Sequence, residues 1–403
     1  MKMIVLIYLS VAVAALVTGS VIAADEIPDL PPLPPLAKIH SGFIPEGWVE
    51  TALVEADLNG DQRNDMAMVI SRPVRPADDF DSNRKEHVLV IALRQGDGSL
   101  KRSAVSDQAV LGDFDGGVLG FPFREMRFER GAVVIEHYGG SRNRWEITSR
   151  YRYQKGHWIL IGRTDEDTDI HYPDFFDKVD FNLSTGLVIR NSRSGGLGDD
   201  DLQAAQRALL KHPEVRYWCL PVPVMRKAPP TDGTPATPDW GFHSLDLNRK
   251  EQVIGNSAGW KGPGDLSATL RAVAAPDGLF LRAEVTDDEV TEEDQVRLTN
   301  EQGVEIKPNI ETRTATPTGY VMVLSWSKAQ LLATLGEDHA DWLDPDYEED
   351  NDATGIGELP VAIEIHDEDG GEMGGTLSTR PLDTPYAAAI SIYTLSTLML
   401  EDQ

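Results

Sequence analysis

The sequence contains a single cysteine, Cys219, among 403 residues. One thiol cannot form an intramolecular disulfide, so no such bridge holds the fold together. The nine histidines are scattered, with no pair four residues apart on a helical stretch, which argues against a zinc site. Stability must therefore come from β-structured cores, with bound metal as a further source. Cys219 itself, between Trp218 and Leu220, is expected to be a small buried hydrophobic residue.

Basic residues are also scarce. The chain has 37 Lys and Arg residues against 66 Asp and Glu, which gives a formal net charge of -29. A surface of this sign repels phosphate backbones, so nucleic acid is excluded as an expected partner. Divalent cations are the natural counterions of such an acidic protein.

Long hydrophobic runs are missing except at the start of the chain. Residues 1–23 combine Lys2, an apolar run and small residues near Ala23, which is the pattern of a cleaved signal peptide. An uncleaved N-terminal anchor is the alternative interpretation. No later run is long enough to cross a bilayer, so we expect no stable membrane span after signal removal. The predicted location is periplasmic or extracellular.

Familiar catalytic motifs are absent from the sequence. It has no G-x-S-x-G elbow, H-E-x-x-H helix, phosphate-binding P-loop or dinucleotide-binding fingerprint. A glycoside hydrolase or lyase stays an alternative, because such enzymes need only two carboxylates flanking the scissile bond. The chain is nevertheless more consistent with a non-catalytic protein, because its N-terminal half is small and β-rich.

Two domains are expected from the length and from the distribution of turns and prolines. After the signal peptide, residues 24–39 form a proline-rich spacer and residues 40–190 a β-rich domain, with hairpin turns at Arg130-Gly131 and Lys155-Gly156. Residues 191–235 are predicted to form a short helix and a Pro/Thr-rich linker. Residues 236–403 form the second domain. The predicted fold class is mostly β, an antiparallel β-rich domain followed by a jelly-roll-like β-sandwich.

An acidic loop in the first domain has the side-chain spacing of a calcium site. Oxygen-bearing side chains occupy positions one, three, five and nine of the loop, and the Arg63 carbonyl is the expected fifth ligand; the four are Asp57, Asn59, Asp61 and Asp65. Gln62 stands where glycine would more easily adopt the required turn, and Met68 where an EF-hand has a bidentate glutamate. We predict bound Ca²⁺. The alternative is an acidic turn whose carboxylates cap their own backbone.

This loop resembles the calcium loops of FG-GAP and integrin-type repeats, in which a D-x-N-x-D-x-x-x-D segment precedes a strand. Only one clear copy is present, so a multi-bladed propeller is not expected. The domain as a whole is similar to a set of uncharacterised secreted bacterial proteins that carry the same type of loop. That similarity rests on segments 116–123, 137–145, 151–162 and 180–186. It implies no activity.

In the second domain, residues 265–288 predict a β-hairpin with one buried face. Apolar residues alternate with polar ones in two runs, at Leu266, Ala268, Leu270 and Ala272, and then at Leu279, Leu281, Ala283 and Val285. Pro276, Asp277 and Gly278 supply the turn between them. Two carboxylates, Asp287 and Asp288, leave the sheet together at the end of the second run.

This hairpin resembles the family 9 carbohydrate-binding modules and related DOMON-like β-sandwiches. The likeness extends from Trp260 and its Gly-Pro-Gly segment, through Trp326-Ser327, to residues 363–371, and it covers roughly residues 236–403. It implies a carbohydrate-binding β-sandwich, in which aromatic side chains stack on sugar rings and carboxylates hold a second ion or polar ligand groups. The candidate ligand-binding residues are Trp240, Trp260, Asp287, Asp288, Trp342 and Tyr347. For Trp240 and Trp260 the alternative is packing in the core or under a loop, and for Trp342 and Tyr347 it is a solvated acidic loop.

Three functions therefore compete. The leading prediction is a secreted, non-catalytic, calcium-stabilised protein that binds carbohydrate or another envelope ligand through the second domain. The alternatives are a secreted glycoside hydrolase or lyase, and a structural or adhesive envelope protein. A binding module predicts exposed aromatic residues on the sandwich, whereas an adhesive protein predicts buried ones and an exposed apolar patch elsewhere. An enzyme predicts two carboxylates facing each other across a cleft.

Overall fold

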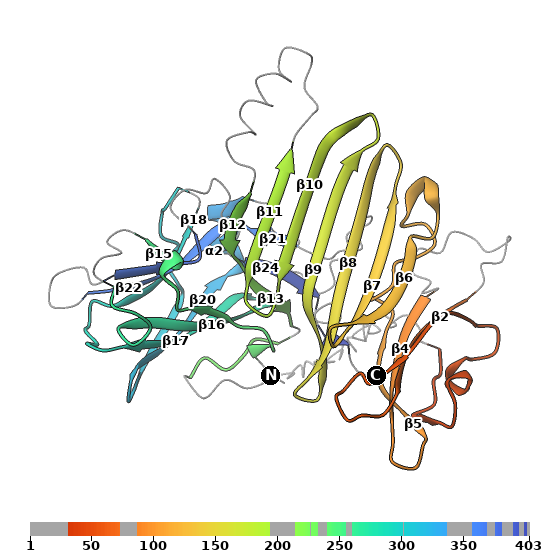
Figure 1. The fold of residues 1–403 in the computed structure, drawn as a ribbon. Helices are drawn as coiled ribbons and strands as arrows, with labels where there is room; N and C mark the ends of the chain where they lie inside the picture. Colours follow the sequence, from red (N-terminus) through yellow and green to blue (C-terminus); the bar gives the residue numbers. More distant parts are fainter. Residues whose placement is uncertain are drawn as a thin grey trace, which may run out of the picture.

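A computed structural model describes the chain in ten segments and a short C-terminal strand: residues 31–72, 87–193, 214–225, 227–232, 240–254, 260–300, 302–336, 357–368, 375–380, 390–394 and 399–400. The fold is mostly β, as the sequence predicts (Figure 1). The described helical elements are short: η1 (His40–Phe43), η2 (Gly117–Leu119), η4 (Lys250–Gln252) and α2 (Lys328–Leu335). No helix in these segments has the length and apolar character needed to cross a bilayer.

Two antiparallel sheets make up the N-terminal half. The first is five-stranded, in the order β1 (Leu36–Ala37), β5 (Leu100–Ser106), β4 (His87–Arg94), β3 (Asp65–Ser71) and β2 (Val49–Ala56). The second follows the order β12 (Val215–Trp218), β11 (Leu187–Arg193), β10 (Tyr172–Asn182), β9 (His157–Asp169), β8 (Asn143–Gln154), β7 (Ala132–Gly140) and β6 (Phe123–Glu129). From β6 to β12 each strand pairs with the next in sequence, so this sheet is a meander.

The central strands of the five-stranded sheet, β3 and β4, are buried on both faces, which explains their unbroken apolar sequence. Ala67 and Val69 of β3 face the large sheet and pack in a core with Ile135 and Trp158. Met66, Met68 and Ile70 of the same strand face the other way, into a second core closed by Phe43 of η1. A strand covered on both sides has no polar face, so its sequence does not alternate.

The C-terminal half is a sandwich of two further sheets. The larger sheet runs β19 (Ile310–Thr316), β20 (Gly319–Ser327), β17 (Gly278–Asp287), β16 (Leu266–Ala275), β13 (Leu220–Val224), β24 (Ile390–Thr394) and β21 (Gly357–Leu359), and β14 (Leu245–Leu247) also pairs with β16. The smaller sheet runs β15 (Val253–Ile254), β23 (Gly375–Ser378), β22 (Val361–Asp367) and β18 (Gln295–Asn300).

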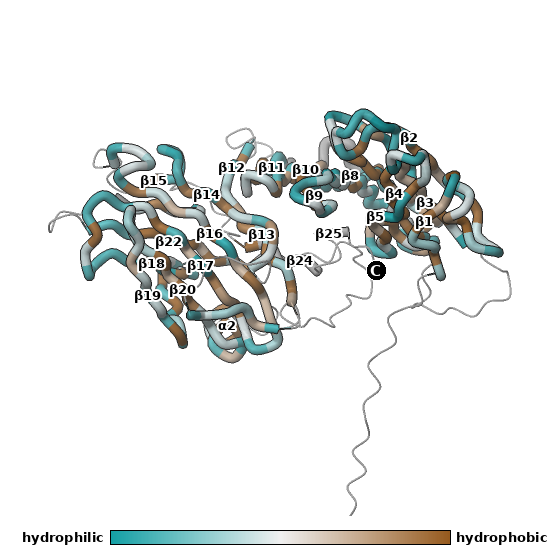
Figure 2. Tube along the Cα trace, turned by 90° about the horizontal axis from the view of Figure 1, so that it is seen from below, coloured by the Kyte–Doolittle hydropathy of each residue, from teal (hydrophilic) through white to brown (hydrophobic). Residues whose placement is uncertain are grey.

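The predicted hairpin is confirmed as β16 and β17, which pair from Leu266↔Asp287 to Ala275↔Gly278. Its apolar face packs against Val296 of β18 and Ile363 of β22 in one core between the two sheets. Trp326, in the same core, donates its indole N–H to the Ile306 carbonyl at 2.7 Å. Figure 2 shows the sandwich beside the N-terminal sheets, with apolar residues (brown) recurring along the strands.

The predicted linker is structurally different from the expectation. Its residues 215–224 form β12 in the large N-terminal sheet and β13 in the sandwich, separated only by the buried Cys219. Pro221 and Pro223 of β13 argue against a strand in the sequence, because proline has no N–H to donate. The two prolines occupy alternate positions, so both missing N–H groups would point toward the same neighbouring strand. The N–H groups that point toward the neighbouring strand on the other side of β13 are retained. The two halves therefore adjoin directly, and His243 Nε2 lies 2.9 Å from the Leu160 carbonyl oxygen across the junction.

Both ends of the described chain also differ from the simple two-domain order. Part of the predicted spacer is packed rather than free, because β1 pairs with β5 and Arg102 donates to the Leu33 carbonyl at 2.6 Å. Near the C-terminus, β25 (Met399–Leu400) pairs with β9 of the N-terminal half. The predicted signal peptide and the predicted helix at 202–212 lie outside the described residues.

His137 of β7 is buried at the edge of the first core and accepts the Leu111 N–H at Nε2 over 3.3 Å. Burial lowers the pKa of His137 from 6.5 to about 3, and the positive charges of Arg163 and His87 add to the effect. Between these two pH values the unfolded chain binds a proton that the folded chain does not. Stability from this residue is therefore complete above the unfolded pKa and is lost as the pH falls.

We expect acidification from about pH 7 to about pH 5 to lower the free energy of unfolding by about 2 kcal/mol through His137 alone. Urea unfolding at both pH values measures this for the wild type and for His137→Gln, whose amide oxygen can still accept the Leu111 N–H. The variant should lose about that much less stability on acidification. Equal losses in the two proteins would show that His137 is not responsible.

Candidate functional site

The acidic loop connects the end of β2 to the start of β3 and is organised by Asp57. Asp57 Oδ1 accepts the backbone N–H groups of Gly60 at 2.8 Å and Asp61 at 3.0 Å. Its Oδ2 accepts the N–H of Gln62 at 2.8 Å. Gln62 has φ 67, which is the left-handed conformation that a calcium-type turn requires at this position. One carboxylate thus closes the turn from within.

Asp65 anchors the other end of the loop in the protein interior. It is fully buried, and its two oxygens accept the N–H of Leu58 at 3.0 Å and the N–H of Arg94 at 2.8 Å. Burial raises the pKa of Asp65, the two N–H groups oppose that rise, and the negative charges of Asp61 and Asp57 add to it. A positive charge in the loop would therefore stabilise the ionised form of this buried carboxylate.

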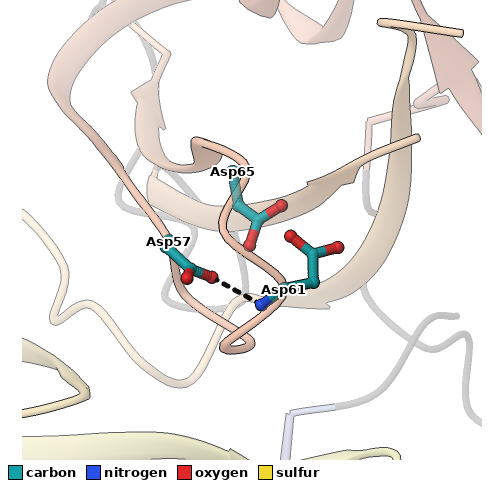
Figure 3. Close-up of side chains that lie close together, drawn as sticks. All are labelled: Asp57, Asp61 and Asp65. Carbon is teal, nitrogen blue, oxygen red and sulfur yellow. Dashed lines mark hydrogen bonds between the residues drawn. The ribbon is translucent and has the colours of Figure 1, made fainter. Parts of the chain in front are cut away.

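The three carboxylates converge. Asp57, Asp61 and Asp65 each offer an oxygen, and these oxygens all lie within 4.8 Å of one another (Figure 3). Asn59 lies in the same turn, where its Oδ1 accepts the Asp61 N–H at 2.9 Å. The Arg63 side chain forms an ion pair with Asp61 at 2.8 Å and lowers the pKa of that carboxyl through hydrogen bonding. The structure therefore brings together the predicted acidic ligands.

Two chemical interpretations fit these contacts. Carboxylates that accept hydrogen bonds from backbone N–H groups are expected in an acidic turn. They are equally expected in a preformed calcium loop. Like charges held this close repel one another unless a cation or a proton lies between them. The Arg63 guanidinium supplies one such positive charge, at Asp61. Several hard oxygen atoms at one point form a site suited to Ca²⁺ rather than to zinc. The Arg63 carbonyl as a further ligand stays a prediction.

The predicted ligand-binding residues of the sandwich do not form one surface. Trp240 is only 1 % exposed, because it covers the outer face of the larger sheet in a core with Phe280 and Val323. The prediction that it offers a platform for a sugar ring is therefore wrong. Trp260 is half-buried and donates its indole N–H to the Leu266 carbonyl at 2.8 Å. Trp342 and Tyr347 lie outside the described residues.

The two carboxylates that end the hairpin point in different directions. Asp288 is exposed, whereas Asp287 is buried and lies beside two aspartates that the sequence analysis missed. Asp287, Asp294 and Asp367 each offer an oxygen, and these oxygens lie within 4.8 Å of one another. Each of the three aspartates lies two positions from the last inward-facing apolar residue of its strand, so it faces the same side. That spacing is visible in the sequence and could have identified them.

A buried hydrogen-bond chain in the first half also escaped the sequence analysis. His87 lies with Nδ1 2.7 Å from Ser71 Oγ and Nε2 2.9 Å from Asp113 Oδ1, and its ring stacks on Phe121. Serine, histidine and aspartate in series are the residues of a nucleophilic triad. Ser71 is only 8 % exposed and its hydroxyl lies against Thr51, so a substrate does not reach it. This series of hydrogen bonds instead connects β2, β3 and β4 to the loop after β5.

The double glycine after Tyr138 serves packing within the protein. A Cβ at Gly139 would lie 2.3 Å from the Trp145 ring, and one at Gly140 would lie 2.0 Å from the Asn143 carbonyl oxygen. The close approach that these glycines allow is thus to the protein's own turn.

Comparison with known proteins adds no assignment: no protein-family model matches the chain, and neither does any curated protein. The resemblances to carbohydrate-binding modules and to FG-GAP loops stay predictions.

Proposed function

We propose that the chain is an exported, non-catalytic protein that is stabilised by calcium and binds carbohydrate or another envelope component. One observation carries the calcium part of this proposal. Asp57, Asp61 and Asp65 hold carboxylate oxygens within 4.8 Å of one another in a turn with the spacing of a calcium loop. A cation there would join β2, β3 and, through the contact of Asp65 with Arg94, β4.

The binding part of the proposal has support of a different kind. Chains of this acidity suit ligands that carry cations or neutral hydroxyl groups, and Trp260 remains a half-buried aromatic side chain beside the sandwich core. The stacking surface of an indole does not need its N–H, so the bond to Leu266 does not itself occupy that surface. Trp260 is therefore the described residue through which we expect a sugar to bind.

An interaction protein without a sugar platform is the second candidate, and a specific observation favours it. Among the described residues from 240 to 380, every aromatic side chain is buried or half-buried. Four exposed apolar side chains lie instead in the first half, on or next to η2 and β7, two elements that contact each other: Phe114, Val118, Leu119 and Tyr138. Phe114 is 65 % exposed and Val118 75 %, which is unusual for such side chains unless they meet a partner.

An array of polysaccharides and envelope fractions, probed with the full chain in calcium and in chelator, tests these alternatives. We expect calcium-dependent binding that is lost in Trp260→Ala and retained in Phe114→Ala. Loss in Phe114→Ala with retention in Trp260→Ala would replace the carbohydrate proposal with the interaction protein. Binding to no glycan and no envelope fraction would contradict both.

A further inference from the structure

The second group of carboxylates lies inside the sandwich, at one end of its core. Inward-facing residues recur at every second position of each strand, and the last of them is an aspartate. In β17 the apolar residue Val285 is followed by Asp287, and in β22 Ile365 is followed by Asp367. Asp294 precedes Val296 of β18 in the same way. The apolar core therefore ends in a layer of carboxylates contributed by both sheets.

The register brings these aspartates together. Gln295 of β18 pairs with His366 of β22, so Asp294 and Asp367 occupy the next positions along the two neighbouring strands. Asp287 approaches from the opposite sheet. All three side chains are buried, with exposures of 5 % for Asp287, 2 % for Asp294 and 1 % for Asp367. Carboxylates removed from water in this way are expected only where they are paired, hydrogen-bonded or bound to a metal.

Local hydrogen bonds fix the orientation of the carboxylates. Asp294 Oδ1 accepts the Thr291 hydroxyl at 2.9 Å and the Glu368 N–H at 3.1 Å, while Oδ2 accepts the Thr291 N–H at 2.6 Å. Arg313 reaches Asp294 Oδ2 at 3.3 Å. Asp287 Oδ1 accepts the Glu289 N–H at 2.9 Å. These bonds hold the oxygens close to one another although their charges repel.

Tyr320 provides an independent sign that something polar belongs among these carboxylates. It faces inward from β20, opposite Val285, and is only 1 % exposed. Its hydroxyl is buried and has no hydrogen-bond partner within the described part of the chain. Arg313, which reaches Asp294 Oδ2 at 3.3 Å, also lies over the Tyr320 ring, 4.0 Å from its centroid. Tyr320 and Asp294 therefore lie beside the same guanidinium group at this end of the core.

We propose that Asp287, Asp294 and Asp367 form a second, buried site for a hard divalent cation, of which Ca²⁺ is the expected occupant, with the Tyr320 hydroxyl facing the bound ion or its water. Oxygen ligands from carboxylates, without histidine or thiolate, select calcium or magnesium over transition metals. The ion would close one end of the sandwich by linking the larger sheet, through β17, to the smaller sheet, through β18 and β22. This site is separate from the Asp57 loop and does not rest on it.

Calorimetric titration of the full chain with calcium, after removal of metal by chelator, tests the proposal. The background variant carries Asp57→Asn and Asp61→Asn, which removes the exposed loop site. We expect the wild type to bind two calcium ions per chain and the background variant one. Adding Asp367→Asn to the background should abolish the remaining site. Asp169→Asn is the matched control, because Asp169 is also buried but lies in β9 of the N-terminal half, where it pairs with Arg142 at 2.9 Å.

The outcomes separate the two calcium sites. Binding of one ion by the wild type and none by the background variant would overturn the buried site and leave the loop site standing. One ion in both proteins, lost in the Asp367→Asn combination, would support the buried site and contradict the loop. Retention of one ion in the Asp367→Asn combination would also overturn the proposal, since that ion would lie elsewhere.

Tyr320→Phe gives a second measurement that does not depend on a charged substitution. Terbium(III) occupies calcium sites and emits when a nearby tyrosine transfers excitation energy to it. In the background variant we expect terbium emission excited through tyrosine, reversed by excess calcium. Tyr320→Phe should weaken this emission while one ion per chain still binds. Unchanged emission in Tyr320→Phe would contradict the placement of the ion beside this hydroxyl.

Discussion

Replacing Asp65 with alanine is expected to lower the free energy of unfolding by roughly 2 to 6 kcal/mol even without calcium. The substitution removes the acceptor for two backbone N–H groups, those of Leu58 and Arg94, at a fully buried position. Each donor left without a partner costs about 1 to 3 kcal/mol. In saturating calcium the loss should be larger, because the same carboxylate is a proposed ligand.

Chemical denaturation in chelator and in calcium measures both parts. Asp97→Ala is the matched control, because Asp97 also caps a turn, accepting the Ser99 N–H at 2.9 Å, but in an exposed position. We expect that control to lose no more than about 1 kcal/mol. If Asp65→Ala were no less stable than Asp97→Ala, the account of Asp65 as the anchor of the loop would be wrong.

The hairpin turn of the sandwich should be as sensitive to substitution. Gly278 begins β17 with φ 150, and a Cβ at this position would lie 1.9 Å from the carbonyl oxygen of Trp326. That oxygen belongs to the backbone of β20, the neighbouring strand, so it cannot move aside without disturbing the sheet. We expect Gly278→Ala to lower the free energy of unfolding by about 2 to 6 kcal/mol, from backbone strain and overpacking together.

Gly264→Ala is the appropriate comparison, because it lies before β16 in the same half of the chain and a Cβ there meets nothing within 4 Å. Its effect should stay within about 0.5 kcal/mol. Thermal unfolding of the two variants in calcium gives the comparison directly. Similar melting temperatures would show that the contact with Trp326 does not constrain the turn.

The hairpin could be predicted because both of its strands are apolar on one face and polar on the other, and because Pro276, Asp277 and Gly278 favour a turn. The calcium-type loop could be predicted because its side chains lie within nine consecutive positions. In each case the pattern that matters is local. A single sequence is therefore enough to predict the hairpin and the loop.

Features that depend on distant segments were not predicted. β13 was assigned to a linker because its prolines conceal a strand that pairs in parallel with β24, far along the chain. Trp240 was a candidate sugar platform because its neighbours are rich in glycine and proline, with core packing as the alternative, and the outer face of the larger sheet buries it. The carboxylates of the sandwich come together only because β18 pairs with β22 and the two sheets pack face to face.

The melting curve of the full wild-type chain in calcium and in chelator tests the central claim, that bound calcium stabilises this fold. Saturation at about 100 times the dissociation constant should stabilise the native state by about 2.7 kcal/mol per site, which is a clear rise in melting temperature. Magnesium should give a smaller rise, because it demands a tighter octahedral site. Superimposable curves in calcium and in chelator would contradict the account.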